Sequence, residues 1–119
     1  MDIQSVSDNI EAKIDQLDKV RLEIRKLTED KAEVVGEYDK ELAKIIIRLR
    51  NQESINVDGE EIRNPPATVM GQIAKGALWE LAIKKDTAEA MYKNAIKVAD
   101  ILQSQLNGWQ SIYRHLDAK

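Results

Sequence analysis

The chain has 119 residues and a mass of 13.5 kDa, which is enough for one domain and too little for two independent cores. Charged residues make up 33% and aromatic residues only 4%, a composition typical of long helices and coiled coils. The absence of Cys excludes disulfides and thiolate metal sites, and the net charge of −3 argues against a protein that binds polyanions with its whole surface.

Location and charge distribution give two further expectations. No apolar run approaches the roughly 18 residues that cross a bilayer, and the start "MDIQSVSDN" is too polar for a signal peptide, so we expect a cytoplasmic protein without membrane contact. Residues 1–62 hold 10 basic and 16 acidic side chains, whereas residues 63–119 hold 8 and 5. We expect these halves to attract each other where they lie side by side.

A first long helix is expected over about residues 5–52, capped by Ser5 or Ser7. Apolar residues recur along it at steps of three and four, with Ile14 standing in for Lys13. Two successive four-residue steps after Leu27 make a stutter, and Gly36 beside it is interpreted as a surface glycine. The predicted buried row is Ile3, Val6, Ile10, Leu17, Val20, Ile24, Leu27, Lys31, Val35, Tyr38, Leu42, Ile45 and Leu49.

A tip is expected over residues 53–65. Asp58-Gly59 is a strong hairpin signal, because a two-residue type I′ turn needs positive φ at both positions. Residues 55–57 and 61–63 would then pair as a short β-hairpin, and an irregular loop over the same span is the alternative. Pro65 and Pro66 prevent helix before them and favour helix after them.

A second long helix is expected over about residues 66–116. Asp86 to Glu89 resembles a capping box and Asn107-Gly108 resembles a helix end, so three shorter helices are the alternative. One continuous helix is preferred because the seven-residue repeat passes both points in phase. The predicted row, in which only Lys84 and Gln105 interrupt the apolar residues, is Ala67, Met70, Ala74, Ala77, Leu81, Lys84, Ala88, Met91, Ala95, Val98, Leu102, Gln105, Trp109, Ile112 and Leu116.

Apolar residues remain outside both rows, and a stripe wider than two positions per heptad favours a bundle over a two-stranded coil. The sequence therefore predicts an all-α fold, in which a long antiparallel two-helix hairpin of coiled-coil type dimerises into a four-helix bundle. The surplus residues are Ile46, Ile47, Leu78, Trp79, Ala82, Ile83, Ile96, Ile101, Leu106 and Tyr113.

Chemistry-bearing residues form no recognisable constellation. His115 is the only histidine, and Asp58, Glu60 and Glu61 lack the ligand alternation of an EF-hand loop. The stretch "GQIAKG" lacks the spacing of a phosphate-binding loop. The sequence therefore predicts no catalytic residue, no metal site and no cofactor, and we expect a protein that is not an enzyme.

Two surfaces near the tip are candidates for binding. Gly71 and Gly76 weaken the helix that contains them and create a smooth face, which is interpreted first as tight packing and second as a docking face for a protein. The residues of that docking face are Arg63, Asn64, Gly71, Lys75, Gly76 and Trp79. A nucleic-acid contact is the alternative for the cations of this region, Arg48, Arg50, Arg63 and Lys75.

The long acidic N-terminal helix, "NPPATVMGQIAKG" and "LNGWQSIYRHLD" together resemble small coiled-coil proteins from bacteriophage early or recombination gene clusters. The resemblance implies a phage origin and a bacterial host cytoplasm, and it implies no activity. The leading interpretation is a non-enzymatic protein that forms homodimers or higher oligomers and binds an unidentified protein partner. The alternative is an accessory factor of phage recombination or replication that contacts single-stranded DNA.

The chain is also similar in architecture to prefoldin β subunits, which place a β-hairpin between two long helices. The expected strands are shorter here, and the two prolines and two glycines depart from that pattern. A prefoldin-like holdase is therefore a second alternative, based on fold analogy alone.

Overall fold

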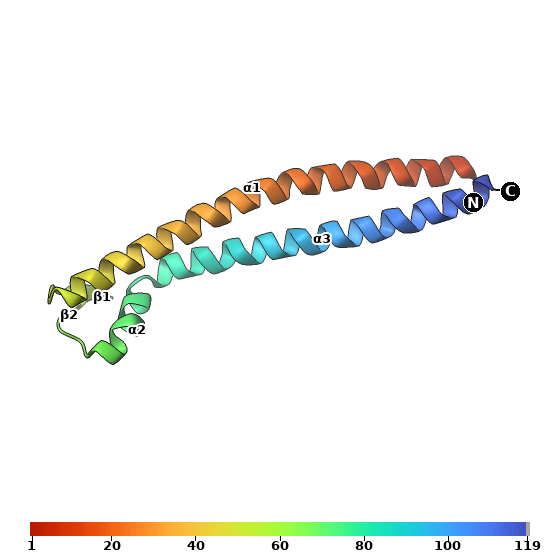
Figure 1. Cartoon of the computed structure of the whole chain (residues 1–119). Helices are drawn as coiled ribbons and strands as arrows, with labels where there is room; N and C mark the ends of the chain where they lie inside the picture. The colour runs from red at the N-terminus through yellow and green to blue at the C-terminus, as the bar shows by residue number, and fades with distance from the viewer. Residues whose placement is uncertain (119) are drawn as a thin grey trace. The chain divides into compact units, whose positions relative to one another are not determined.

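The computed structural model describes residues 1–118, and these are mostly helical (Figure 1). Two long helices, α1 (Ile3–Arg50) and α3 (Trp79–Asp117), are joined by a short region that contains two strands and a third helix. That region comprises β1 (Ile55–Val57), β2 (Glu60–Ile62) and α2 (Ala67–Ala77). The chain divides into two compact units, and each is described by itself below.

The ends of α1 are fixed by local hydrogen bonds. The Asp2 carboxylate accepts a hydrogen bond from the Ser5 backbone N–H at 2.7 Å, so Asp2 is the N-cap and the expectation of Ser5 or Ser7 is wrong. At the other end, the backbone N–H of Glu53 donates to the Arg48 carbonyl and that of Gln52 to the Leu49 carbonyl. These two bonds, with Gln52 at φ 63°, are a Schellman motif that ends the helix.

The inward row of α1 follows the sequence prediction closely. Val6, Leu17, Leu27, Tyr38 and Leu49 are buried, and the remaining predicted positions are half-buried except Ile3, which is exposed. The four-residue steps after Leu27 keep this row inward without a break in the helix. The expectation that Ile14 takes the place of Lys13 in this row is wrong. Lys13 is half-buried and Ile14 is exposed, so the long aliphatic stem of the lysine covers the seam.

The tip contains the predicted β-hairpin. Ile55 pairs with Ile62 and Val57 with Glu60, so the second strand lies one residue earlier than expected. Asp58 (φ 50°) and Gly59 (φ 87°) form the two-residue turn with the positive φ values that a type I′ turn requires. The Gly59 backbone N–H also donates to the Asn56 side-chain oxygen at 2.8 Å.

The second helical segment is interrupted at Leu78, a position that carries no sequence signal for a break. Leu78 (φ −104°, ψ 26°) caps α2, and its backbone N–H donates to the Lys75 carbonyl. Beyond it α3 runs unbroken through Asp86–Glu89 and Asn107-Gly108. The preferred continuous helix is thus right at those two points and wrong at Leu78.

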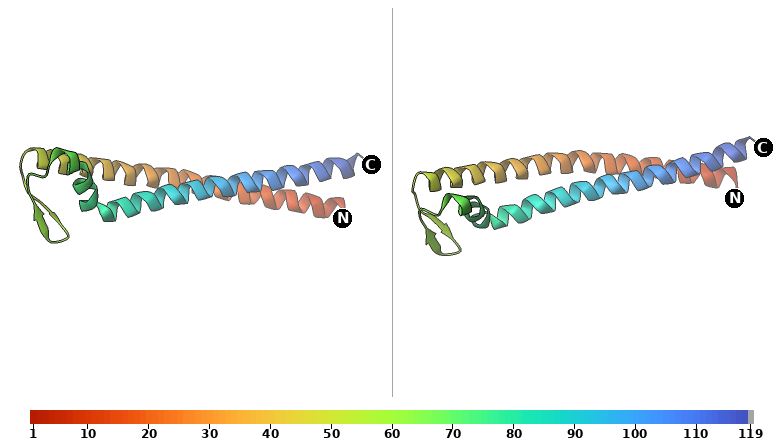
Figure 2. Two further views of the ribbon diagram at one scale, coloured as in Figure 1. Left: turned by 90° about the horizontal axis from the view of Figure 1, so that it is seen from below. Right: turned by 60° about the horizontal axis from the view of Figure 1, so that its bottom comes forward.

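In the part of the chain that is described, the first unit contains residues 1–28, with the start of α1, and residues 90–118, with the end of α3. The two helical segments lie side by side and run in opposite directions (Figures 1 and 2). Its buried side chains are Val6, Leu17, Leu27, Ala95 and Leu106.

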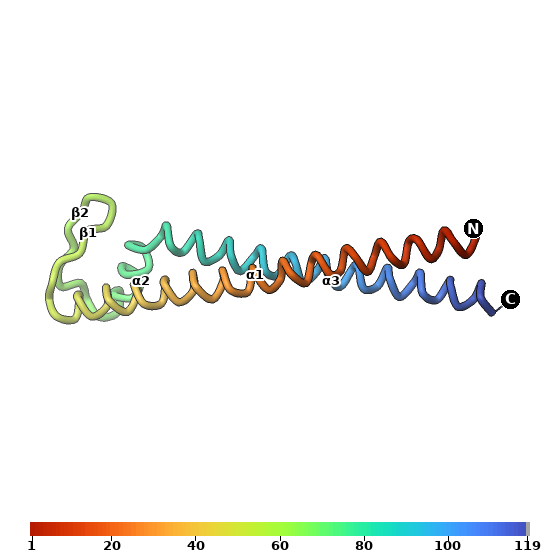
Figure 3. Tube along the Cα trace, turned by 90° about the horizontal axis from the view of Figure 1, so that it is seen from above, coloured from red at the N-terminus to blue at the C-terminus, as the bar shows by residue number. Residues whose placement is uncertain are grey.

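The second unit contains residues 29–89. Here the hairpin and α2 lie near the end of α1 (Figure 3), and α2 packs against β1. Its buried side chains are Tyr38, Leu49, Ile55 and Ala74. The Lys85 ammonium lies 4.4 Å from the centre of the Tyr38 ring, which joins the start of α3 to α1 within this unit.

The predicted row of α3 is only half right. The members Leu81, Ala88, Ala95, Leu102, Trp109 and Leu116 are half-buried or buried as expected. The alternate members Lys84, Met91, Val98, Gln105 and Ile112 are exposed, as is Ala67 of α2. The inward places of Lys84, Met91, Val98 and Gln105 are taken by the residues one position later, Lys85, Tyr92, Ala99 and Leu106. Tyr113, which follows Ile112, is exposed as well. In the part of the chain that is described, no helix has the length and apolar character needed to cross a membrane.

Candidate functional site: two exposed surfaces

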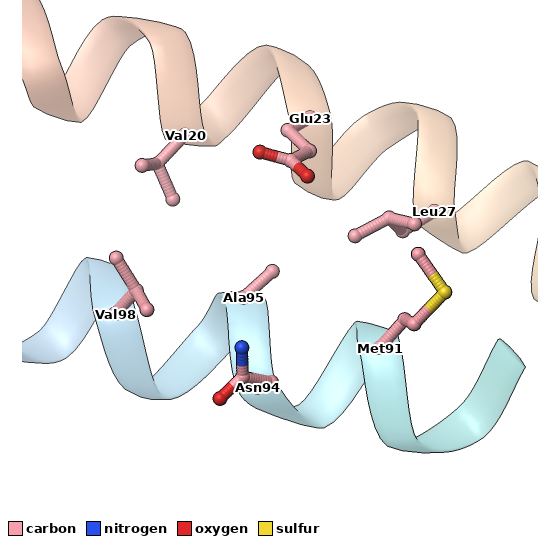
Figure 4. A pocket seen from close by; sticks show the side chains of 7 residues that line it. All are labelled: Val20, Glu23, Leu27, Met91, Asn94, Ala95 and Val98. Atoms are coloured by element: carbon pink, nitrogen blue, oxygen red, sulfur yellow. The ribbon is translucent and has the colours of Figure 1, made fainter. Parts of the chain in front are cut away.

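The first unit contains a groove of about 140 Å³ between its two helical segments (Figure 4). Val20 and Leu27 of α1 face Met91, Ala95 and Val98 of α3 across it. Glu23 and Asn94 add two polar groups to this lining. A cavity of about 150 Å³ with apolar walls is large enough to hold one benzene molecule, so this groove can take one aliphatic or aromatic side chain.

An exposed apolar row on α3 borders the groove. Met91 is 51% exposed and Ile101 is 58% exposed, and Val98 and Ile112 are exposed as well. Large aliphatic side chains left in water on one helix face are a marker of an interaction surface. Sequence reasoning placed Met91, Val98 and Ile112 in the buried seam and left Ile101 as surplus. The signal it missed is that α3 has apolar residues at neighbouring positions, so that either of two helix faces is apolar enough to be the buried one.

The predicted partner-binding residues of α2 are all exposed. Ala74 is fully buried toward the second unit's interior, whereas Gly71, Lys75 and Gly76 are exposed. At 100° per residue, Gly71 lies about 60°, Lys75 about 100° and Gly76 about 160° from Ala74 around the helix axis, so these exposed positions extend from beside Ala74 to the opposite side of the helix.

The two glycines of α2 are not explained by packing within the chain. A Cβ atom built on Gly71 or Gly76 would meet nothing within 4 Å. The first interpretation of these glycines, as close packing against the first helix, is therefore wrong. The docking interpretation stays a prediction.

The other predicted partner-binding residues flank α2. Arg63 follows β2 and lies 3.6 Å from the Glu61 carboxylate, and Asn64 has a left-handed backbone at φ 52°. Trp79 begins α3 and is 48% exposed. The structure thus brings all six predicted residues into the second unit, on three successive segments.

The four cations predicted for nucleic-acid contact are also in the second unit. Arg48 and Arg50 occupy the last turn of α1, and Lys75 lies in the last turn of α2. All four are exposed, and the charge of Arg63 is partly neutralised by Glu61. DNA contact by these residues stays a prediction.

Metal-ligating side chains are scattered over residues 1–118. No group of three or more His, Asp or Glu side chains in this range is placed to hold a metal ion. His115 is exposed in the last turn of α3.

Comparison with known proteins returned nothing similar: no family model matches the chain, and no curated protein or solved structure matches it.

Proposed function

We propose that the chain is a non-enzymatic protein of a phage-related setting that forms a homodimer and acts by binding a further protein. The observation that carries this proposal is the exposed apolar row of α3 beside the groove of the first unit. Among the described residues of that unit, Met91, Val98, Ile101 and Ile112 are large and exposed, whereas only five side chains, one of them an alanine, are buried. Two helices alone leave too much apolar surface in water.

The energetics favour a four-helix bundle over a contact between only two helices. Burying a half-exposed Met, Val or Ile side chain contributes about 1 kcal/mol, so the four residues of the row contribute about 8 kcal/mol in a dimer. Association costs about 4–15 kcal/mol in lost translational and rotational freedom. The free energy gained by burying the row is therefore about equal to the cost of association. A stable dimer needs the groove to be covered as well. A second pair of helices laid over the first covers both.

The partner protein is assigned to the exposed residues of α2 and its flanks. This assignment is supported by Arg63, Asn64, Gly71, Lys75, Gly76 and Trp79 all being exposed and all belonging to the second unit. Two glycines that no neighbour within the chain requires allow a partner backbone to approach this face closely. The phage setting follows from the resemblance of "NPPATVMGQIAKG" and "LNGWQSIYRHLD" to phage coiled-coil proteins.

The dimer is tested by sedimentation equilibrium over a wide range of protein concentration. We expect a mass of twice 13.5 kDa at high concentration. A single-chain mass at the highest concentration reached would refute the dimer.

The partner face is tested by capture from the phage-infected host with two variants as matched baits. Gly71→Leu adds bulk at an exposed position of α2, and Ala43→Leu adds a similar bulk at an exposed position of α1. We expect a protein that binds the wild type and Ala43→Leu to be lost with Gly71→Leu. Equal capture by all three baits would remove α2 from the proposal.

A further inference from the structure

The outward face of α3 carries a second seven-residue repeat. Starting at Met91, it advances by alternating steps of three and four residues, and every member in the first unit is exposed. This outward row is Met91, Asn94, Val98, Ile101, Gln105, Gly108 and Ile112. The inward row of α3 lies one position further along, so the helix has two parallel seams, of which only one is covered within the chain.

The outward row is complementary to itself when read backwards. A two-fold axis between Ala99 and Asp100 would place Val98 opposite Ile101 of the second copy and Asn94 opposite its Gln105. The same axis would place Met91, the bulkiest member, opposite Gly108 of the second copy. In this register apolar side chains lie opposite apolar ones and an amide lies opposite an amide. The long Met91 side chain lies opposite a glycine, which has no side chain.

The neighbouring antiparallel registers lack this match. Shifting the axis by half a heptad in either direction would place Asn94 opposite Val98 or opposite Ile112 of the second copy. Each shift buries an amide against an aliphatic side chain, and an unpaired buried amide is costly. A parallel, in-register dimer would pair the amides, but it would set Gly108 against Gly108 and leave a void.

Gly108 itself supports the antiparallel register. It lies inside α3, where glycine weakens the helix, and a Cβ atom built on it would meet nothing within 4 Å of the same chain. The chain alone therefore gives no reason for a glycine at this position. The Met91 side chain of a second copy supplies one.

The groove of the first unit is continuous with the outward row, since Met91, Asn94 and Val98 belong to both. In the matched register these three residues face Gly108, Gln105 and Ile101 of the second copy. Ile101 of the second copy then lies next to the apolar wall formed by Val20 and Val98, and its Gln105 lies near the polar groups of Asn94 and Glu23.

We propose that the occupant of this groove is α3 of a second copy, packed antiparallel along the outward row with the two-fold axis between Ala99 and Asp100. This rests on the proposed homodimer and adds its geometry. Each copy covers the other's groove. Because of the two-fold symmetry, the Asn94–Gln105 pair and the Met91–Gly108 pair each occur twice in the dimer.

Disulfide trapping tests the register, because the chain contains no Cys of its own. Val98→Cys and Ile101→Cys are prepared separately, mixed in equal amounts, refolded together and oxidised. We expect the mixed 98–101 disulfide to be the main cross-linked product, whereas each variant alone cross-links poorly. Lys93→Cys, exposed on the same helix but off the row, replaces Val98→Cys in the control mixture.

The outcomes separate the register from the dimer. Efficient cross-linking of Val98→Cys with itself would show a parallel arrangement and overturn this inference. Dimeric mass by sedimentation with no more mixed cross-link than the Lys93→Cys control would also overturn it and leave the proposed homodimer standing. A single-chain mass for the wild type would remove both.

A size-swap experiment tests the pairing of Met91 with Gly108 without cysteines. Gly108→Leu should raise the dimer dissociation constant about tenfold or more by overpacking, while helix content by circular dichroism stays the same or rises. Adding Met91→Ala should recover much of the lost affinity. A Gly108→Leu variant that dimerises as well as the wild type would refute the pairing.

Discussion

The two long helices differ in how many of their faces are apolar. α1 has one inward row, and the residues beside it are mostly charged, so a single stripe of Val, Leu and Tyr side chains decides its orientation. α3 has two adjacent rows, one buried within the chain and one exposed. An uninterrupted heptad pattern therefore identifies a helix that packs against at least one other helix, whereas the width of its apolar arc indicates how many neighbours it has.

The sharpest test of this comparison places the same charge on the two rows of α3. Ala95→Asp buries an unpaired carboxylate and should lower the free energy of unfolding by about 3–5 kcal/mol. Val98→Asp, three residues later on the outward row, should keep its helix content but sediment as a single chain. Denaturant unfolding at fixed protein concentration, together with sedimentation, measures both effects. Equal loss of helix in the two variants would mean that the rows are assigned wrongly.

The next test compares the two faces of α1. Leu17→Ala removes a side chain that is 3% exposed and should cost about 2–4 kcal/mol of unfolding free energy. Leu22→Ala makes the same chemical change at a side chain that is 66% exposed, and it should change stability by less than about 0.5 kcal/mol. A cost for Leu22→Ala comparable to that for Leu17→Ala would give α1 a second covered face and remove the contrast with α3.

The same contrast explains what the sequence could and could not predict. The row of α1 was predictable, including its stutter after Leu27, because one phase alone gathers the apolar residues. The phase of α3 was not, because pairs such as Met91-Tyr92 and Val98-Ala99 satisfy two phases equally. The turn at Asp58-Gly59 was predictable because its backbone requirement is local.

Other features depend on contacts that local patterns do not contain. The break at Leu78 follows no Pro or capping signal, and it allows α2 to pack on β1 while α3 continues elsewhere. At Asp86 the situation is reversed. The capping-box pattern is a local signal for a helix start, but the fold overrides it and α3 continues through it. Of the candidate sites, the exposure of Gly76 follows from Ala74 facing inward, because Gly76 lies about 160° from Ala74 around the helix, whereas the exposure of Gly71 does not. The groove in the first unit requires the antiparallel pairing to be known first.

The start of α1 offers a smaller test, at the edge of its well-predicted row. Asp2→Ala removes the carboxylate that accepts the Ser5 N–H and should cost about 1 kcal/mol of unfolding free energy. Ser7→Ala, at the cap position that the sequence also favoured, should cost well under that amount. Fraying of the first turn measured by amide hydrogen exchange should follow the same order. A larger loss for Ser7→Ala would move the helix start inward.

The smallest effect is expected where α3 meets α1 in the second unit. Lys85 occupies an inward position of α3, and its ammonium lies over the face of the buried Tyr38 ring. Such a cation–π contact contributes about 0.5–1 kcal/mol, so Lys85→Ala should destabilise by about that amount. Lys40→Ala, at an exposed lysine of the same unit, is the control and should be nearly neutral.

A double-mutant cycle with Tyr38→Leu isolates the pair, because Leu keeps an apolar side chain beneath Lys85 but has no ring. A coupling energy near zero would show that Lys85 is inward only through its aliphatic stem. The inward row of α3 would then tolerate a lysine for the same reason that α1 tolerates Lys13.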